Sequence, residues 1–441
     1  MPSWRAPWPA SVLVLAALAA YAGAFGGSFQ FDDFNVIVGQ PAVHALAAWW
    51  DSMPGIRPLL KLSYALSWGA GGGSTIAFHA LNVALHAANV VLVWLVLQEL
   101  LRRMGVAGDG FAAFAGALLF ALHPAHTEAV TYISGRSVSL MALFYLASVL
   151  AYLREGPRWL SPALFLAALA TKEVAVTLPF ALLLCDALDT KRGFDPRRQW
   201  PHWLVLGVGL ALMAALPRYR EMLETSLALR SFAEQFQLQV AAIARHVGVL
   251  ILAVPPNIDP VVPPMPPIAG LAVLAAIAVG FALLRVQPWY AFALLWFFLH
   301  LAPTNSLLPR LDAVNDRQLY LASIGPLALA GFAISLMPRW RVPMLAVLAG
   351  VLGIATVARN LDYRTEVALW SDTVRQSPRG ARAWNNLGHA LQLEGRRDAA
   401  CAAYASAVRI DPGHLQARIN ALELRCTPDP RSPGAAPGTP R

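Results

Sequence analysis

The residues of this chain best suited to catalysis are three carboxylates at the borders of long apolar segments. Asp32 and Asp33 follow the first segment, and Glu128 lies between two later ones. A carboxylate can take the proton of a hydroxyl group during a transfer reaction. We expect Asp33 to be the base, with Asp32 next, unless the aspartate pair only caps a helix or turn. Glu128 could steer the acceptor, bond to a histidine or neutralise Arg136, and these alternatives stay open.

Three cations complete the candidate chemistry. Arg136, Lys172 and Arg317 each lie at the end of an apolar segment. Such side chains hold phosphate through charge-assisted hydrogen bonds, so together they suit a phosphate leaving group. The structural alternative is that they pair with neighbouring carboxylates of the chain. These carboxylates are Glu128, Glu173 and Asp316.

Further polar residues beside the same segments are expected to line a cavity. Three of them, His79, Asn82 and His86, have helical spacing and share one face with Asn89. Such a face turns inward in a membrane protein, where it lines a pathway or only hydrogen-bonds to neighbouring helices. No ligand spacing is diagnostic of a metal, so we assign no metal ligands, and dependence on a divalent metal stays open. The cavity-lining candidates are Arg57, His79, Asn82, His86, His123, His126, Glu173 and Asp316.

The elements that position these residues are predicted to be membrane-spanning helices. Of the 441 residues, 57% are hydrophobic and 13% are charged. Together with repeated apolar runs of about twenty residues, this composition is typical of a polytopic membrane protein. The net charge of +9 arises mostly in short loops between apolar segments. There it orients helices, and it indicates no nucleic-acid partner.

The hydrophobic pattern predicts about eleven spans. Basic loops alternate with the loops that carry the polar motifs, which places the basic loops in the cytoplasm and the motifs outside it. The first span could instead be a cleaved signal peptide. Residues 236–254 are interrupted by charge, and we interpret them as a surface or re-entrant helix. The predicted spans are 11–26, 78–101, 111–125, 137–153, 159–171, 173–189, 201–217, 268–285, 289–302, 319–337 and 342–357.

The first extracytoplasmic loop, residues 27–77, is long enough to hold structure of its own. It contains Trp49 and Trp50 within an amphipathic stretch over 43–53. Because tryptophans favour the membrane interface, this stretch predicts a helix lying along the membrane surface.

A helical repeat follows the apolar part of the chain. Residues 381–414 have the spacing of a tetratricopeptide repeat, 364–378 match the second helix of a degenerate preceding repeat, and 414–425 match a capping helix. The chain therefore divides into a membrane domain (1–358), a repeat module (359–426) and a disordered tail (427–441). The residues that carry the repeat pattern are Trp384, Leu387, Gly388, Ala400, Tyr404, Ala407 and Pro412.

Two cysteines lie in the repeat module. Cys401 is near the start of the repeat's second helix, and Cys426 is just past the capping helix. Because consecutive repeat helices run antiparallel, these two ends should meet, which makes a disulfide geometrically possible. The alternative is two unpaired thiols in small packing positions.

The motifs also follow one another in a specific order. They are Asp32-Asp33, Arg57-Pro58-Leu59, His79 with Asn82 and His86, His123-Pro124 with Glu128 and Gly135-Arg136, Lys172-Glu173, and Arg317-Gln318-Leu319-Tyr320-Leu321. In this order, and with repeats behind them, they resemble the transmembrane and tetratricopeptide-repeat O-mannosyltransferase-like family.

The resemblance implies a C-type glycosyltransferase fold and an integral membrane enzyme. Such an enzyme moves a mannose-like hexose from an undecaprenyl- or dolichyl-phosphate carrier to an extracytoplasmic acceptor, either protein Ser/Thr or an envelope glycan. Its partners are membrane lipids, the lipid-linked donor and an acceptor that the repeat module could engage. The alanine- and proline-rich composition indicates a bacterial inner membrane, with the site and the repeats facing the periplasm.

Two other functions compete with the enzyme. One is a membrane scaffold that acts through its repeats, although eleven spans exceed what anchoring requires. The other is a lipid-linked sugar transporter, which would spread its charges through the membrane midplane rather than gather them at one face. A soluble nucleotide-sugar donor is disfavoured, because Gly71-Gly72-Gly73 lies in a loop and not between a strand and a helix.

Overall fold

The chain folds entirely into helices in the part that the structure describes. The computed structural model describes residues 8–53, 55–106, 110–190, 195–305, 309–310 and 312–426, and every regular element there is helical. This confirms the predicted all-α fold. The described residues form two compact units. The first comprises the residues up to Leu361 except Asn257–Val261, and the second comprises Asn257–Val261 and the residues from Asp362 onward. The predicted disordered tail, 427–441, lies outside the described residues.

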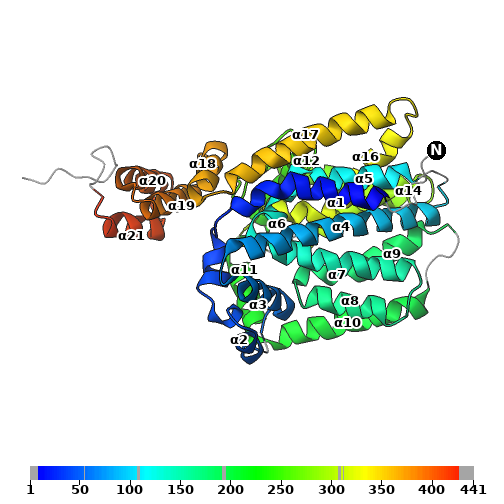
Figure 1. Ribbon diagram of the computed structural model, residues 1–441, viewed down its shortest axis with the longest axis horizontal. Coiled ribbons are helices and arrows are strands. Elements are labelled where there is room, and N and C mark those ends of the chain that lie inside the picture. Colours follow the sequence, from blue (N-terminus) through cyan, green and yellow to red (C-terminus); the bar gives the residue numbers. More distant parts are fainter. Residues whose placement is uncertain are drawn as a thin grey trace, which may run out of the picture. The chain divides into compact units, whose positions relative to one another are not determined.

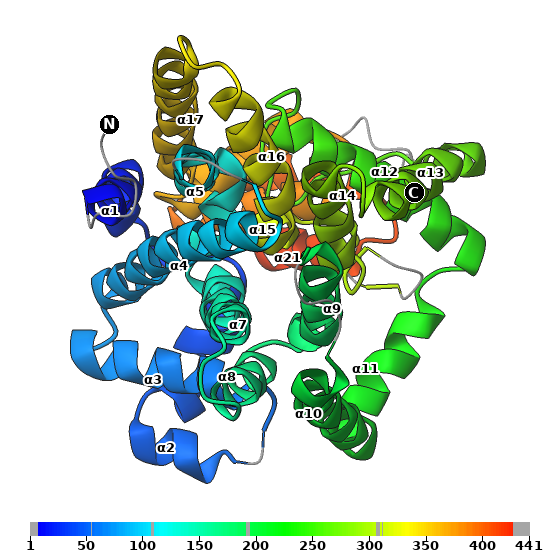
Figure 2. The ribbon, with the colours of Figure 1, turned by 90° about the vertical axis from the view of Figure 1, so that its right-hand side faces the viewer.

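The first unit is a bundle of helices packed side by side. Figure 1 shows α1 (Trp8–Tyr21), α4 (Thr75–Arg103), α7 (Arg136–Leu153), α8 (Leu160–Leu169) and α10 (Pro196–Ala215) in neighbouring positions, and Figure 2 shows most of them end-on. Connections therefore alternate between the two ends of the bundle. The loop after α1 and the short helix α6 (Thr127–Val130) lie at one end, and the basic connections lie at the other.

The remaining elements of this unit surround or cap that row. They are α2 (Leu46–Asp51), α3 (Pro58–Gly71), α5 (Phe111–Leu122), α9 (Leu178–Leu188), α11 (Pro217–Ala228), α12 (Phe232–Leu250), α13 (Gly270–Leu283), α14 (Pro288–Leu301), α15 (Leu319–Ala322), α16 (Ile324–Ser335) and α17 (Arg341–Asp362). Three 3₁₀ turns bear on the site, namely η5 (Ile133–Gly135), η6 (Glu173–Thr177) and η8 (Asp316–Gln318).

Each of the eleven predicted spans overlaps a helix, but not every helix has the length of a span. Among the described residues, four helices are long and apolar enough to cross a membrane: Trp8–Gly26, Thr75–Arg103, Ile133–Leu153 and Arg341–Asp362. The count rises to six if α10 with α11, and the segment Asp316–Ala322 with α16, each form one bent span. The total of about eleven spans stays a prediction, as does the surface or re-entrant placement of α12.

A contact between glycines joins α5 to α16. A Cβ atom on Gly331 would lie 2.5 Å from the backbone nitrogen of Gly116 and 2.6 Å from the carbonyl oxygen of Ala112. The two backbones therefore touch, as membrane helices do where small residues meet. Because Glu128 follows α5 and Arg317 precedes α16, this crossing helps to place both residues.

The loop between α1 and α4 contains more structure than the sequence indicated. The predicted stretch contains the helix α2, and the Trp50 side chain on it is 68% exposed, while the placement of this helix along the membrane surface stays a prediction. Helix α3, which the sequence analysis did not predict, follows directly. The Trp49 indole donates a hydrogen bond to the carbonyl oxygen of Pro58 (2.9 Å), so α2 is held against the start of α3.

The second unit contains the helices that the repeat pattern predicted. They are α18 (Glu366–Gln376), α19 (Ala381–Leu393), α20 (Arg397–Ile410) and α21 (Leu415–Glu423). A Cβ atom on Gly388 would lie 2.6 Å from the ring of Tyr404, so only glycine allows α19 and α20 to pack this closely. The segment Asn257–Val261, which the sequence analysis did not assign to this module, pairs with it through a salt bridge of 2.5 Å between Asp259 and Arg382.

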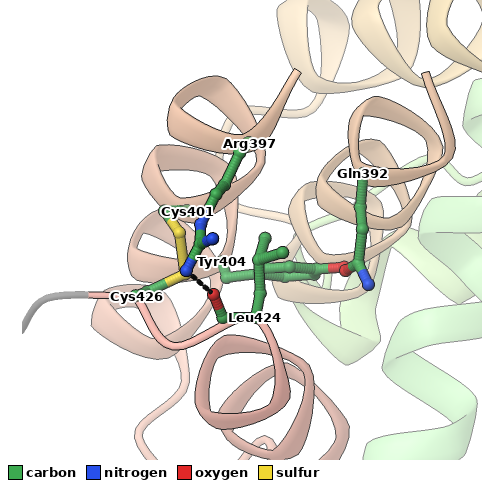
Figure 3. The surroundings of a disulfide bond; sticks show 6 residues. All are labelled: Gln392, Arg397, Cys401, Tyr404, Leu424 and Cys426. Atoms are coloured by element: carbon green, nitrogen blue, oxygen red, sulfur yellow. Dashed lines mark hydrogen bonds between the residues drawn. A yellow bond between two sulfur atoms is a disulfide. The ribbon is translucent and has the colours of Figure 1, made fainter. Parts of the chain in front are cut away.

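A disulfide joins Cys401 on α20 to Cys426 just after α21 (Figure 3). Their Cα atoms are 5.5 Å apart, within the range that a disulfide requires. Beside it, the Arg397 guanidinium donates to the carbonyl oxygen of Leu424 (2.6 Å), at the end of α21. The expectation that the two helix ends meet is therefore confirmed.

Candidate active site

Asp33 is enclosed at the site end of the bundle. Its side chain is fully buried, and its carboxylate accepts hydrogen bonds from the backbone N–H of Gln30 (3.0 Å) and of Ser134 (2.8 Å), and from the Ser134 hydroxyl. Burial raises the pKa of Asp33 to about 7, against the opposing effect of these hydrogen bonds. The carboxylate thus fastens the loop after α1 to η5.

Gly135 makes this connection sterically possible. A Cβ atom at this position would lie 2.0 Å from the carbonyl oxygen of Glu128. Any larger residue would push η5 away from α6, and Ser134 would move with it. The Gly-Arg motif is therefore a packing requirement that sets the position of Asp33.

Asp32 lies beside Asp33 but is only partly buried. Its backbone N–H donates to the Tyr132 hydroxyl (2.9 Å), so the residue is held by the same segment between α6 and η5. Burial lowers the pKa of Arg317, but the charges of Glu128, Tyr132, Asp32 and Asp312 outweigh that effect and raise it. Asp32 therefore lies close enough to Arg317 to act on its charge.

Glu128 pairs with Arg317. Its carboxylate accepts a hydrogen bond from the Arg317 backbone N–H (3.0 Å) and lies 3.4 Å from the Arg317 Nε. Burial raises the pKa of Glu128 to about 7, although Arg317 opposes this shift. Of the three roles left open, the geometry favours neutralising an arginine, and that arginine is Arg317 rather than Arg136.

A pocket lined by cations adjoins this pair. Lys172, Arg310 and Arg317 line it together with apolar side chains that include Val174 and Leu321. Burial, together with the positive charges of Arg317, Arg57 and Arg310, holds the pKa of Lys172 well below its ordinary value. The Lys172 ammonium donates to the Ser137 hydroxyl (3.1 Å). Among the described residues, no carboxylate lies within 4.0 Å of it.

Arg136, the third cation of the predicted phosphate grip, does not line this pocket. Its guanidinium is fully buried and donates to Asn82 Oδ1 (2.6 Å), to the Ser67 hydroxyl (2.9 Å) and to the carbonyl oxygens of Ser63 and Phe78 (both 2.9 Å). These partners come from α3 and α4. The geometry therefore favours a brace between three helices, because four of the five guanidinium N–H donors bond to these partners.

Arg57 and Glu173 form a second structural link beside the pocket. The Arg57 guanidinium donates to both Glu173 oxygens at 2.8–3.1 Å, and the Tyr219 hydroxyl donates to the same carboxylate (3.0 Å). Arg57 has a left-handed backbone with φ of 54°, which is strained for an arginine. Glu173 is thus paired with Arg57, and its neighbour Lys172 remains available to the pocket.

Asp316 and the polar stripe also serve contacts between helices. Asp316 is buried and lies 3.3 Å from Arg245 of α12. Asn82 donates to the carbonyl oxygen of Val130 (3.0 Å). The four candidate histidines bond to backbone carbonyl oxygens: His79 to Gly27 (3.2 Å), His86 to Ala121 (3.1 Å), His123 to Leu250 (3.0 Å) and His126 to Phe120 (2.9 Å). No group of three metal-binding side chains converges within the part of the chain that is described.

The sequence analysis missed two residues of this region, Arg310 and Tyr219. Arg310 lies in the connection between α14 and η8, away from any recognised motif. Tyr219 lies on α11, in a stretch not predicted to be regular. For Arg310, the signal in the sequence is the basic character of the connection between α14 and η8, because Arg310 lies only seven residues before Arg317.

The architecture is that of a helical membrane domain followed by a helical repeat module, with carboxylates and cations gathered at one end of the membrane domain. Sequence comparison finds relatives of the same kind. Over 140 positions, covering 30% of this chain and 15% of the relative, the chain is 43% identical to protein O-mannosyl-transferase Tmtc1 of Drosophila melanogaster.

Two longer matches extend over most of the chain. Protein O-mannosyl-transferase Tmtc3 of Drosophila melanogaster is 26% identical over 82% of this chain and 49% of the relative, and TMTC3 of Mus musculus is 24% identical over 93% and 52%. The chain spans about half the length of these relatives. No family model and no solved structure matches it. The chain is a relative of the transmembrane and tetratricopeptide-repeat protein O-mannosyl-transferases, which confirms the predicted resemblance.

Proposed function

We propose that this protein is an integral membrane glycosyltransferase that moves a mannose-like hexose from a polyprenyl-phosphate donor to a hydroxyl group of a protein outside the cytoplasm. The observation that carries the proposal is the pocket lined by Lys172, Arg310 and Arg317, the last of which pairs with Glu128 and has its pKa raised by the charge of Asp32 among others.

The pocket suits a phosphate that is attached to a lipid. Three cations line it, and burial together with the nearby charges of Arg317, Arg57 and Arg310 disfavours the protonated form of Lys172. A bound anion would reverse that effect, because an opposite charge favours the protonated lysine. Apolar side chains such as Val174 and Leu321 form the rest of the lining. A polyprenyl chain can lie against such surfaces while its phosphate contacts the cations.

In the proposed reaction Asp32 is the base. It takes the proton of the acceptor hydroxyl as the hydroxyl oxygen bonds to the anomeric carbon of the hexose. The bond from that carbon to the phosphate oxygen breaks, and the lipid phosphate leaves with the electron pair. Lys172, Arg310 and Arg317 stabilise the negative charge that develops on the phosphate. The sugar is inverted at its anomeric carbon.

The two aspartates take different roles in this scheme. Asp33 was our first choice of base, and a pKa of about 7 suits that task. Its carboxylate is nevertheless fully buried and accepts three hydrogen bonds from Gln30 and Ser134. Since a base must contact its proton donor, we assign the proton transfer to the partly exposed Asp32 and a positioning role to Asp33.

The names of the relatives support a protein acceptor over an envelope glycan. Their printed names describe protein O-mannosyl-transferases. We propose that the acceptor is Ser or Thr of a periplasmic protein, that the donor is undecaprenyl-phosphate mannose in a bacterial inner membrane, and that the repeat module also faces the periplasm. The disulfide supports an external repeat module, because disulfides persist in oxidising compartments.

The test is a transfer assay with purified full-length protein in lipid nanodiscs, supplied with undecaprenyl- or dolichyl-phosphate mannose and a Ser/Thr-rich peptide. Asp32→Asn should lower the transfer rate by at least about 10²-fold, the usual size of general-base help, while melting behaviour is unchanged. Asp51→Asn, an exposed aspartate on α2, is the matched control and should leave the rate unchanged.

Two results would overturn parts of the proposal. If Asp33→Asn abolished transfer at unchanged thermal stability while Asp32→Asn kept wild-type rates, the base would be Asp33. If the wild-type protein bound neither lipid-phosphate mannose nor the lipid phosphate alone, the glycosyltransferase proposal would fail.

A further inference from the structure

Helix α11 leaves the bundle at a sharp angle. Helix α10 ends at Ala215, and α11 begins at Pro217 and is turned by 80° from it. Leu216 between them has an extended backbone, as residues before proline prefer, and proline suits the first turn of a helix. If α10 crosses the membrane, α11 must run nearly parallel to the membrane plane at the site end of the bundle.

Helix α11 is amphipathic and is not packed into the protein. None of its residues is buried. Leu223 and Leu227 are four positions apart and share one face with Tyr219 and Arg220, and the two leucine side chains are 47% and 57% exposed. Leu216, just before the helix, is 37% exposed. Glu221 and Thr225 lie on the opposite face. A helix with one exposed apolar face and one polar face is typical of a segment that lies in the membrane interface.

We propose that α11 binds the outer lipid leaflet through Leu223 and Leu227, together with Leu216 just before the helix, and that it holds the wall of the cation pocket through Tyr219. The continuity with α10 supports lipid as the occupant. Leu204, Val208 and Leu212 along α10 are exposed in the same way, so an apolar surface extends from the span into α11.

One hydrogen bond connects this helix to the pocket. The Tyr219 hydroxyl donates to the Glu173 carboxylate (3.0 Å), which also binds Arg57. Glu173 is the first residue of η6 and directly follows Lys172, which lines the pocket. Tyr219 is therefore a positioning residue, and α11 lies where a lipid-linked donor would pass from the leaflet into the pocket. This part of the inference rests on the proposed function.

The lipid contact is tested without any assay of activity. A fluorescent label on an introduced cysteine reports its surroundings in nanodiscs, because Cys185 is buried and the other two cysteines form the disulfide. Labels at Leu223→Cys and Leu227→Cys should be quenched by lipids that carry a spin label near the headgroup. Labels at Glu221→Cys and Thr225→Cys should be quenched by iodide in the aqueous phase.

Either of two patterns would overturn the lipid contact. Equal quenching of all four labels by iodide would mean that α11 lies in water. Protection of all four from both quenchers would mean that protein covers the helix. Both results are independent of whether the protein transfers a sugar, so this inference can fail while the proposed function stands.

The link to the pocket is tested with Tyr219→Phe, which removes only the hydroxyl group. It should weaken binding of undecaprenyl-phosphate mannose by about tenfold, the size expected for loss of one hydrogen bond to a charged group, and raise KM with little change in kcat. Tyr290→Phe on α14 is the matched control, since the hydroxyl of this half-exposed tyrosine has no hydrogen-bond partner among the described residues. Unchanged affinity in Tyr219→Phe, with wild-type protein that does bind the lipid, would overturn the link.

Discussion

Replacing Arg136 by lysine separates two roles that this residue could have. As a brace, its guanidinium gives four hydrogen bonds to α3 and α4 from within a fully buried position. A lysine ammonium has three donors on a single nitrogen, so at least one of these four oxygens would be left unpaired. At about 1.5–3 kcal/mol for each hydrogen bond to a charged group, Arg136→Lys should destabilise the fold by at least that amount.

The assay is the fraction of protein that stays monodisperse in detergent after heating, measured beside binding of undecaprenyl phosphate at a temperature where the variant is still folded. Arg136→Lys should melt earlier but bind the lipid phosphate as the wild type does. Lys172→Gln supplies the comparison, because it should lose lipid-phosphate affinity without loss of stability. An Arg136→Lys protein with wild-type melting and weakened phosphate binding would refute the brace and restore Arg136 to the phosphate grip.

Three further outcomes follow from the described contacts. Affinity for undecaprenyl-phosphate mannose, a phosphodiester whose charge is constant near neutrality, should fall as pH rises through about 7, because Glu128 becomes charged there beside Arg317. Calorimetry across this range should show a weaker pH dependence for Glu128→Gln, which stays neutral. Gly135→Ala should destabilise the fold by about 1–3 kcal/mol, measured by thermal melting, and should reduce the transfer rate in the peptide assay. A wild-type melting temperature would contradict the close approach of Gly135 to the Glu128 carbonyl oxygen. Cys401→Ser should destabilise α21 by about 3 kcal/mol, the value expected for opening a loop with a sequence separation of 25. Hydrogen exchange of the α21 amides should become faster, and an unchanged exchange rate would mean that the disulfide does not stabilise this helix.

The helices of the membrane domain could be predicted because long apolar runs are recognisable from a single sequence. The loops could not be predicted as well. Helix α3 lies within the predicted loop 27–77, and α11 follows a predicted span, because each is short or mixes apolar and charged residues. The repeat helices were predicted from fixed spacings. The antiparallel order of two helices predicted that the ends carrying Cys401 and Cys426 meet, which made the observed disulfide possible.

The candidate site was predicted in its location but not in its internal pairing. Charges at the ends of apolar segments mark a region, and these ends do gather at one side of the bundle. Which cation meets which carboxylate depends on the three-dimensional packing. Glu173 binds Arg57 from a distant loop and Asp316 binds Arg245, while Lys172 next to Glu173 remains for the pocket. Arg136 also lies at the end of an apolar segment, but four of its five guanidinium donors bond to partners inside the protein.

The glycine contact between α5 and α16 controls the alignment of the Glu128–Arg317 ion pair from a distance. Gly116 lies six residues before the end of α5 at Leu122, and Gly331 lies seven after the start of α16 at Ile324, so each is about 9–10.5 Å of helix away from the helix end nearer the site at 1.5 Å per residue. Two rigid helices in backbone contact behave as a pivot. A single methyl group at the pivot would open the angle between them, and the helix ends, from which short segments lead to the carboxylate and the guanidinium, would separate by more than the methyl group itself adds. The alignment of the ion pair is therefore specified by two positions that carry no side chain and lie well outside the site.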